Sequence, residues 1–218
     1  MESIINDLAH WCPKNGLIIT EDASALKYLE GVLIPSLKGI DNFEKDAKEY
    51  SDNIDHSMFE ERLITVKTYM EKYIRELYKK YKDVDVVLMS SFGAKMHLQK
   101  CESDIDFGIV VHKLDDYKMD CYSHILLENG FIYTDRVFTF EKDGIHIEAK
   151  IRDNNESEDI IILHWFLDNY LDVNIKNILT YTKELAIENK QSYDGLKYLI
   201  YCGYMSYVKQ LKKKIRGI

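Results

Sequence analysis

The feature that most constrains the fold is a change of hydrophobic period near residue 80. Before it, apolar residues recur every three or four positions, at Phe59, Leu63, Val66, Met70, Tyr73 and Leu77. This spacing places one apolar stripe along a helix, so it predicts a long amphipathic helix over residues 57–80. The β-branched run at 84–89 then predicts a buried strand. This order indicates a domain that mixes helices and strands.

The next elements continue the mixed pattern. The sequence predicts a strand at 105–111, a helix at 117–129, and two strands at 131–140 and 145–151. Asp143-Gly144 lies between the last two runs, and an Asp-Gly pair between alternating runs is typical of a β-hairpin. The predicted order is therefore helix, strand, strand, helix, strand, strand.

Helical patterns flank this region on both sides. Leucines at helical spacing predict a short N-terminal helical region, followed by a loop or loose helix at 41–56. After a polar loop at 153–157, the sequence predicts helices at about 158–170, 173–189 and 193–215. We therefore expect three regions: an N-terminal helical extension at 1–56, a mixed domain at 57–157, and a C-terminal helical region at 158–218.

Charge limits the surfaces that the chain offers. The net charge of −8 disfavours a protein that coats nucleic acid over a wide area, although it is compatible with a small basic groove. One dense cationic cluster lies near the C-terminus, at Lys209, Lys212, Lys213, Lys214 and Arg216. A solvated helix end, where positive charge complements the helix dipole, explains this cluster without a ligand.

Composition also indicates where the protein works. The longest apolar runs fall far short of the roughly 20 residues that cross a bilayer, and the N-terminus lacks a basic-then-apolar signal pattern. The four cysteines are scattered without CxxC spacing, which argues against a disulfide framework or a zinc site. We therefore expect a soluble, cytoplasmic protein without a membrane partner.

The candidate catalytic residues begin with Asp104 and Asp106. On a strand, residues two apart point to the same face, so these two carboxylates converge while Ile105 and Phe107 anchor the opposite face. Two like charges side by side are costly unless a cation neutralises them. Oxygen-rich sites of this kind suit magnesium or manganese. Alone, the pair is weak evidence, because exposed strands often carry two acids.

Two further features give this pair a context. The first strand ends at Ser90-Ser91-Phe92-Gly93, small residues whose hydroxyl and N–H groups are suited to phosphate binding. A third acid, Glu148, lies in an alternating run on the face opposite the core isoleucines, so it joins the Asp pair if the strands are neighbours. His146 shares that face, and we interpret it as a polar residue that flanks the site.

These motifs together resemble the nucleotidyltransferase superfamily of DNA polymerase beta. Its pattern is a strand, a Gly-Ser type turn, a spacer, an Asp-x-Asp strand, and a third acid on a later strand. Two registers of the turn fit: Gly93-Ala94 with nine spacer residues before Asp104, or Ser90-Ser91 with twelve. The first puts alanine at the serine position, and the second puts serine at the glycine position. The resemblance covers roughly residues 59–151.

The resemblance implies a fold, a site and a reaction. The fold is α+β, a catalytic lobe with a mixed β-sheet and helices on one face, plus a helical lobe. Asp104, Asp106 and Glu148 are implied to bind two Mg²⁺ or Mn²⁺ ions, and Ser90, Ser91 and Gly93 to bind the nucleoside triphosphate. A hydroxyl then attacks the α-phosphate and pyrophosphate leaves.

The acceptor stays open at this point. The region 175–208 is similar in layout to the helical lobe of poly(A) polymerases and terminal uridylyltransferases, which favours template-independent addition to the 3′-hydroxyl of RNA. A protein partner subunit would then supply the basic RNA surface that this chain lacks. Transfer to a small molecule or a protein hydroxyl, as in aminoglycoside nucleotidyltransferases, fits the acidic charge equally well. A catalytically silent binding module is the third alternative, and the three intact acids argue against it.

Overall fold

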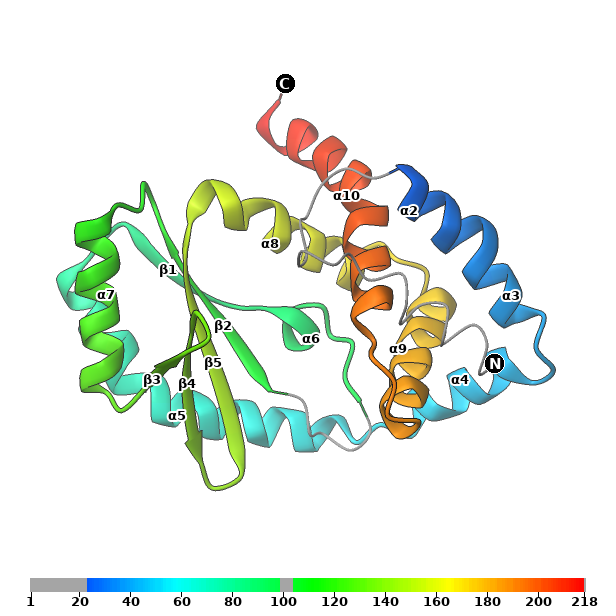
Figure 1. Ribbon diagram of the computed structural model, residues 1–218, viewed down its shortest axis with the longest axis horizontal. Helices are drawn as coiled ribbons and strands as arrows, with labels where there is room; N and C mark the ends of the chain where they lie inside the picture. Colours follow the sequence, from blue (N-terminus) through cyan, green and yellow to red (C-terminus); the bar gives the residue numbers. More distant parts are fainter. Residues whose placement is uncertain (1–22, 99–103, 218) are drawn as a thin grey trace. The chain divides into compact units, whose positions relative to one another are not determined.

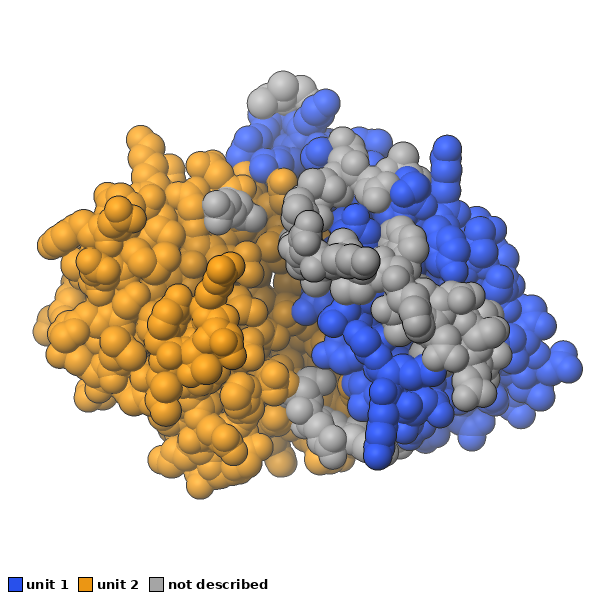
Figure 2. Space-filling view, viewed as in Figure 1, with its two compact units in different colours: residues 1–54, 165–218 blue, residues 55–164 orange. Residues whose placement is uncertain are grey.

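The computed structural model describes residues 23–98 and 104–217. These residues form two compact units, which Figure 2 colours separately. One unit spans Asp55–His164, and the other combines the described parts of Met1–Ile54 and Trp165–Ile218. The N-terminal extension and most of the C-terminal helical region thus belong to a single unit. The first 22 residues of the expected extension lie outside the described residues.

The unit Asp55–His164 is built on a five-stranded sheet. In sequence order its elements are α5 (His56–Lys80), β1 (Val84–Leu88), α6 (Ser90–Gly93), β2 (Ile105–Val111), α7 (Asp116–Glu128), β3 (Ile132–Thr134), β4 (Val137–Lys142) and β5 (Ile145–Asp153). The strand order is β1-β2-β5-β4-β3. Among the strands that the structure describes, only β2 and β5 pair in parallel, so the sheet is mixed, as expected.

Helices α5 and α7 contact each other and cover one face of the sheet (Figure 1). The apolar stripe of α5 is buried as its spacing predicts, except for the half-buried Leu63. On the covered face, Ile105, Ile147 and Ala149 are fully buried. Because side chains alternate along a strand, the polar residues between them lie on the other face.

Two tight turns shape the β3-β4-β5 meander. Asp143 and Gly144 both have positive φ, 53° and 74°, as a two-residue hairpin turn requires. Asp135 and Arg136 form an equivalent turn, with φ of 50° and 69°. The single strand expected at 131–140 is therefore wrong, because this second turn divides it into β3 and β4. Because the pair Asp135-Arg136 contains no glycine, the sequence pattern alone did not predict this turn.

The polar loop expected at 153–157 is also wrong. Strand β5 runs to Asp153 and α8 (Asn154–Asn169) begins at the next residue. The Asp153 carboxylate accepts hydrogen bonds from the N–H groups of Leu114 and Asn155, both at 2.8 Å, and these bonds lower its pKa. A capping aspartate thus lets polar residues fill the first turn of α8.

The second unit is helical. Its elements are α2 (Ala23–Tyr28), the π-helical stretch η1 (Leu29–Leu33), α3 (Ile34–Lys38), α4 (Phe43–Asp52), the end of α8, α9 (Val173–Glu188) and α10 (Asp194–Arg216). The N-terminal helices pack on the C-terminal ones. Tyr50 of α4 donates a hydrogen bond to Glu184 of α9 at 3.1 Å, and the rings of Phe43 and Tyr181 lie 5.3 Å apart. Within the described residues, no helix has the length and apolarity to cross a bilayer.

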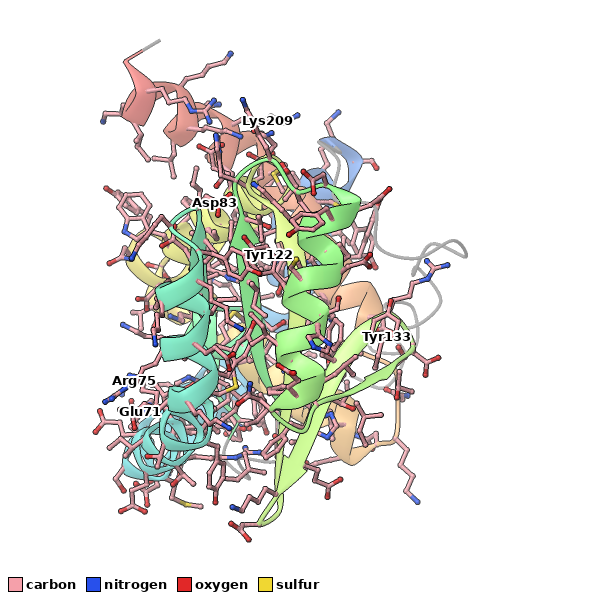
Figure 3. All side chains as sticks on the ribbon, turned by 90° about the vertical axis from the view of Figure 1, so that its left-hand side faces the viewer. Glu71, Arg75, Asp83, Tyr122, Tyr133 and Lys209 are labelled. Carbon is pink, nitrogen blue, oxygen red and sulfur yellow. The ribbon has the colours of Figure 1, made fainter. Side chains whose placement is uncertain are left out.

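A polar cluster ties the start of β1 to α7. The Asp83 carboxylate accepts hydrogen bonds from the Lys118 ammonium and from the Tyr122 hydroxyl, the latter at 3.3 Å (Figure 3). Lys118 also donates to the His112 carbonyl at 2.8 Å. The Lys118 hydrogen bond lowers the pKa of Asp83, whereas burial raises the pKa of Tyr122.

This cluster gives a pH-dependent prediction. Because the pKa of Asp83 is lowered in the fold, its stabilisation is present above the unfolded value of about 3.9 and is lost as pH falls through the folded value. Asp83→Asn should cost up to about 1 kcal/mol near neutral pH, a small value because the pair is partly exposed. Urea unfolding at descending pH should show the wild-type advantage vanish in acid. The exposed Asp85→Asn serves as control, and an equal loss in both variants would contradict the assignment.

Candidate active site

The core of the site is a pair of carboxylates on neighbouring strands. In the parallel ladder of β2 and β5, Asp106 and Glu148 are direct register partners. Residues opposite each other in a ladder present their side chains to the same face. The interleaved residues Ile105 and Ile147 are also partners, and both are fully buried on the helix-covered face. The ladder therefore presents both carboxylates on the face that α5 and α7 leave uncovered.

Asp104 immediately precedes β2, and its exposed side chain extends the group at the strand's beginning. The potential ligand atoms of Asp104, His146 and Glu148 all lie within 4.8 Å of one another. His146 lies two residues before Glu148 on β5 and so shares its face. The imidazole is thus part of the cluster itself, a placement closer than the flanking position inferred from the sequence.

A lysine and a histidine lie beside Glu148. The Nζ atom of Lys150 lies 3.4 Å from Glu148 Oε2, and the Nε2 atom of His146 lies 3.8 Å from Oε1. The Glu148 side chain is 23% exposed. Lys150 therefore offsets part of the carboxylate charge at a half-buried position, where an uncompensated charge is costly.

The donor set fits a divalent cation. Asp104 and Glu148 offer oxygen atoms at one point of the sheet, and Asp106 is anchored beside them by the ladder. Carboxylate oxygens are the preferred protein ligands of Mg²⁺ and Mn²⁺, so these residues suit either ion. Asp104 and Glu148 would hold such an ion, with His146 within reach of the same point, whereas Asp106, the register partner of Glu148, is not part of this converging group.

The turn after β1 lies directly beside this cluster. The Met89 N–H donates to the Asp106 carbonyl at 2.9 Å, which fixes the start of α6 against β2. The Gly93 and Ala94 N–H groups bond back to Met89 and Ser90, both at 3.0 Å. Ser90 and Ser91 form the first turn of this short helix.

Ser90 and Gly93 occupy very different positions in this turn. Ser90 has a φ of 51°, a left-handed conformation that glycine adopts readily and other residues adopt at a cost. Gly93 instead lies in a tight contact: a Cβ there would fall 2.7 Å from His164 Nδ1 and 2.8 Å from the Leu88 carbonyl oxygen. Close packing alone therefore requires glycine at 93, whereas the backbone conformation favours glycine at 90.

The structure thus places the expected residues in one region through two kinds of interaction, strand pairing and a backbone hydrogen bond. The ladder positions Asp106 and Glu148, with Asp104 adjacent, and the Met89 bond positions Ser90 and Ser91. Gly93 is positioned by packing under His164. His146, which the sequence analysis interpreted as flanking the site, lies within the cluster. Its two-residue spacing from Glu148 was the available signal.

Comparisons with known proteins identify the fold. No family model matches the sequence, and no curated protein matches it. A solved structure of Cid1, described in terms of its RNA terminal uridylyl transferase activity, has a TM-score of 0.51 at 19% identity. The match covers 67% of this chain and 47% of that one. Over the matched residues, the chain has the nucleotidyltransferase fold of this structure. The α+β fold class expected from the sequence is confirmed.

Other solved structures match this nucleotidyltransferase fold at a similar level. A cytoplasmic RNA terminal U-transferase has a TM-score of 0.49 at 20% identity, over 68% of this chain and 46% of that one. Cid1 poly(U) polymerase with Mg 3′-dATP bound has a TM-score of 0.49 at 19% identity, over 67% and 48%. The chain spans about half the length of the solved structures that it matches.

Proposed function

We propose that this chain is a template-independent nucleotidyltransferase that adds a nucleoside monophosphate to the 3′-hydroxyl of RNA. One observation carries the proposal: Asp106 and Glu148 are register partners on parallel strands, with Asp104 beside them and the turn after β1 bonded to Asp106. Three acids and a serine-containing turn at one end of the sheet suit the transfer of a nucleotidyl group. The nucleotidyltransferase fold supports this assignment.

The chain's own residues prepare the reaction. Asp104, Asp106 and Glu148 would hold the divalent ions, which would polarise the α-phosphate and favour deprotonation of the attacking hydroxyl. Lys150 lies against Glu148 Oε2 and limits the directions in which that carboxylate can turn. In-line attack then requires that the triphosphate be held beside Asp106, which is where the turn after β1 lies.

The phosphate-binding register is Ser90-Ser91 in this proposal. Ser90 takes the place of the glycine, because it has the positive φ that the turn demands. Ser91 then takes the place of the serine, whose hydroxyl would contact a phosphate oxygen. Gly93 contributes by packing, since its lack of a side chain is explained by His164 and Leu88.

Variants of the turn test this register. Ser91→Ala should weaken nucleoside triphosphate binding by roughly 0.5 to 3 kcal/mol, the range for a lost hydrogen bond to a charged group. Ser90→Gly should retain binding and stabilise the fold by up to about 1 kcal/mol, because glycine adopts positive φ without strain. Calorimetric titration with a non-hydrolysable triphosphate and urea unfolding measure both effects. Unchanged affinity in Ser91→Ala would refute the register.

RNA is proposed as the acceptor because the Cid1 structure that the chain resembles is described by its RNA terminal uridylyl transferase activity. A net charge of −8 leaves little surface for RNA phosphates. We therefore include in the proposal a protein partner that adds basic surface. The basic residues Lys213, Lys214 and Arg216 occupy the last turn of α10, as a solvated helix end requires.

One experiment tests the proposed function. The purified chain is incubated with each labelled nucleoside triphosphate, Mg²⁺ or Mn²⁺, and either a short RNA, the same RNA with a blocked 3′ end, or no acceptor. Extension of the free 3′ end alone supports the proposal, and the triphosphate that extends it identifies the base preference. Pyrophosphate release that does not depend on the RNA would indicate that the acceptor is a small molecule or a protein instead. No turnover under any of these conditions would support a catalytically silent binding module instead.

A further inference from the structure

The imidazole of His146 lies inside the acidic cluster. Its ligating nitrogen, one Asp104 oxygen and one Glu148 oxygen lie within 4.8 Å of one another. The ladder explains this proximity: Asp106 pairs with Glu148 and Ile105 with Ile147, so Asp104 comes beside His146 one step earlier. On the same face, the acid pair Asp106–Glu148 is thus followed, two residues earlier on each strand, by Asp104 beside His146.

An ion pair with Glu148 does not account for this placement. His146 Nε2 lies 3.8 Å from Glu148 Oε1, beyond hydrogen-bonding distance. Lys150 lies on the other oxygen, at 3.4 Å from Oε2. The two oxygens of Glu148 are therefore approached from different sides, and Oε1 and Nε2 stand near the roughly 3 to 3.5 Å separation of two ligands with bonds of about 2.1 Å to one ion.

Carboxylates also surround the imidazole on both neighbouring strands. Asp104 lies on the β2 side, and Glu141 of β4 is the register partner of His146 on the other side. Histidines that bind metals commonly donate their second N–H to a carboxylate, which fixes the ring orientation. The ladder places Glu141 in the position for this role.

The chemistry of the imidazole nitrogen determines which metal ion binds more tightly when His146 is a ligand. Mg²⁺ is a hard cation that takes oxygen ligands and keeps several waters. Imidazole nitrogen binds first-row transition metals better, and Mn²⁺ accepts both carboxylate and imidazole. We propose that His146 is a direct ligand of the ion held by Asp104 and Glu148 and that it makes this site prefer Mn²⁺ over Mg²⁺. This inference rests on the proposed function, because the same carboxylates must hold a divalent ion.

The test measures metal binding with the metal alone, independently of turnover. Mn²⁺ is titrated into the full chain and free Mn²⁺ is followed by electron paramagnetic resonance, with Mg²⁺ affinity obtained by competition. Electron spin echo measurements on the bound Mn²⁺ detect a directly coordinated ¹⁴N nucleus. The variant is His146→Gln, and the matched control is His124→Gln, since His124 also faces a glutamate, with Nε2 3.1 Å from Glu128 Oε1 on α7.

The expected result is a ¹⁴N signal in the wild type and in His124→Gln that disappears in His146→Gln. Mn²⁺ affinity should fall roughly tenfold in His146→Gln, while Mg²⁺ affinity changes much less. A wild-type site that binds Mn²⁺ without a ¹⁴N signal, or with a Mn²⁺ to Mg²⁺ preference unchanged by His146→Gln, would overturn the inference and leave the proposed function standing. Failure of both ions to bind would overturn both, and Glu148→Gln, which should abolish binding, verifies that the measured site is this one.

Discussion

Asp106→Asn should lower nucleotidyl transfer at least about a hundredfold, equivalent to roughly 2.7 kcal/mol of transition-state stabilisation. Asparagine keeps the size of the side chain but removes the anionic oxygen that binds the ion. Asp106 is the register partner of Glu148, so the same loss is expected of Glu148→Gln. Initial rates of pyrophosphate release at saturating triphosphate measure the effect.

The fold should survive these substitutions. Each removes a like charge from a cluster of acids, and two neighbouring carboxylates destabilise each other unless an ion or a lysine compensates them. In metal-free buffer, the melting temperature of Asp106→Asn should therefore equal or exceed that of the wild type. Asp120→Asn, an exposed position on α7, is the control for the loss of one negative charge. Activity above about a tenth of wild type, an effect under ~1.4 kcal/mol, would refute the metal assignment.

Gly93→Ala should unfold or strongly destabilise the sheet unit. The added Cβ would lie 2.8 Å from the Leu88 carbonyl oxygen, which belongs to the β1 backbone and cannot shift without disturbing the β1-β2 ladder. It would also lie 2.7 Å from Nδ1 of His164, a buried ring. Overpacking of this kind typically costs about 1 to 3 kcal/mol, and contact with the backbone places Gly93 at the upper end.

Urea unfolding measures this effect. Gly31→Ala is the control, because a Cβ at Gly31 meets nothing within 4 Å. The double variant with His164→Ala should recover only part of the loss, since the clash with Leu88 remains. A Gly93→Ala protein of normal stability that fails to bind triphosphate would instead move the phosphate contact to Phe92-Gly93-Ala94.

Sequence patterns predicted most of the regular structure. The period of the apolar residues predicted α5, and alternation predicted β2 and β5 close to their observed bounds. Asp143-Gly144 predicted the hairpin turn, because few residue pairs adopt two positive φ angles easily. Asp135-Arg136 adopts the same geometry without that chemistry, and Asp153 caps α8 directly after a strand. Both departures arise where tertiary context overrides a weak local signal.

For the candidate site too, the sequence predicted some features and only the tertiary structure showed others. The sequence indicated that Asp104 and Asp106 share a face and that Glu148 opposes its neighbouring isoleucines, because strand alternation is a local property. Which strands are neighbours is a non-local property, and only the tertiary structure showed that β5 lies beside β2 in the register that pairs Asp106 with Glu148.

The chain's local patterns therefore determined its helices, most of its strands and the identity of its acids. The tertiary structure decided which residues meet: His146 with Asp104, Gly93 with His164, and Ser90 in a left-handed turn bonded beside Asp106. The physical reason is that secondary structure follows from interactions a few residues apart, whereas register, close packing and backbone strain depend on segments distant in the chain.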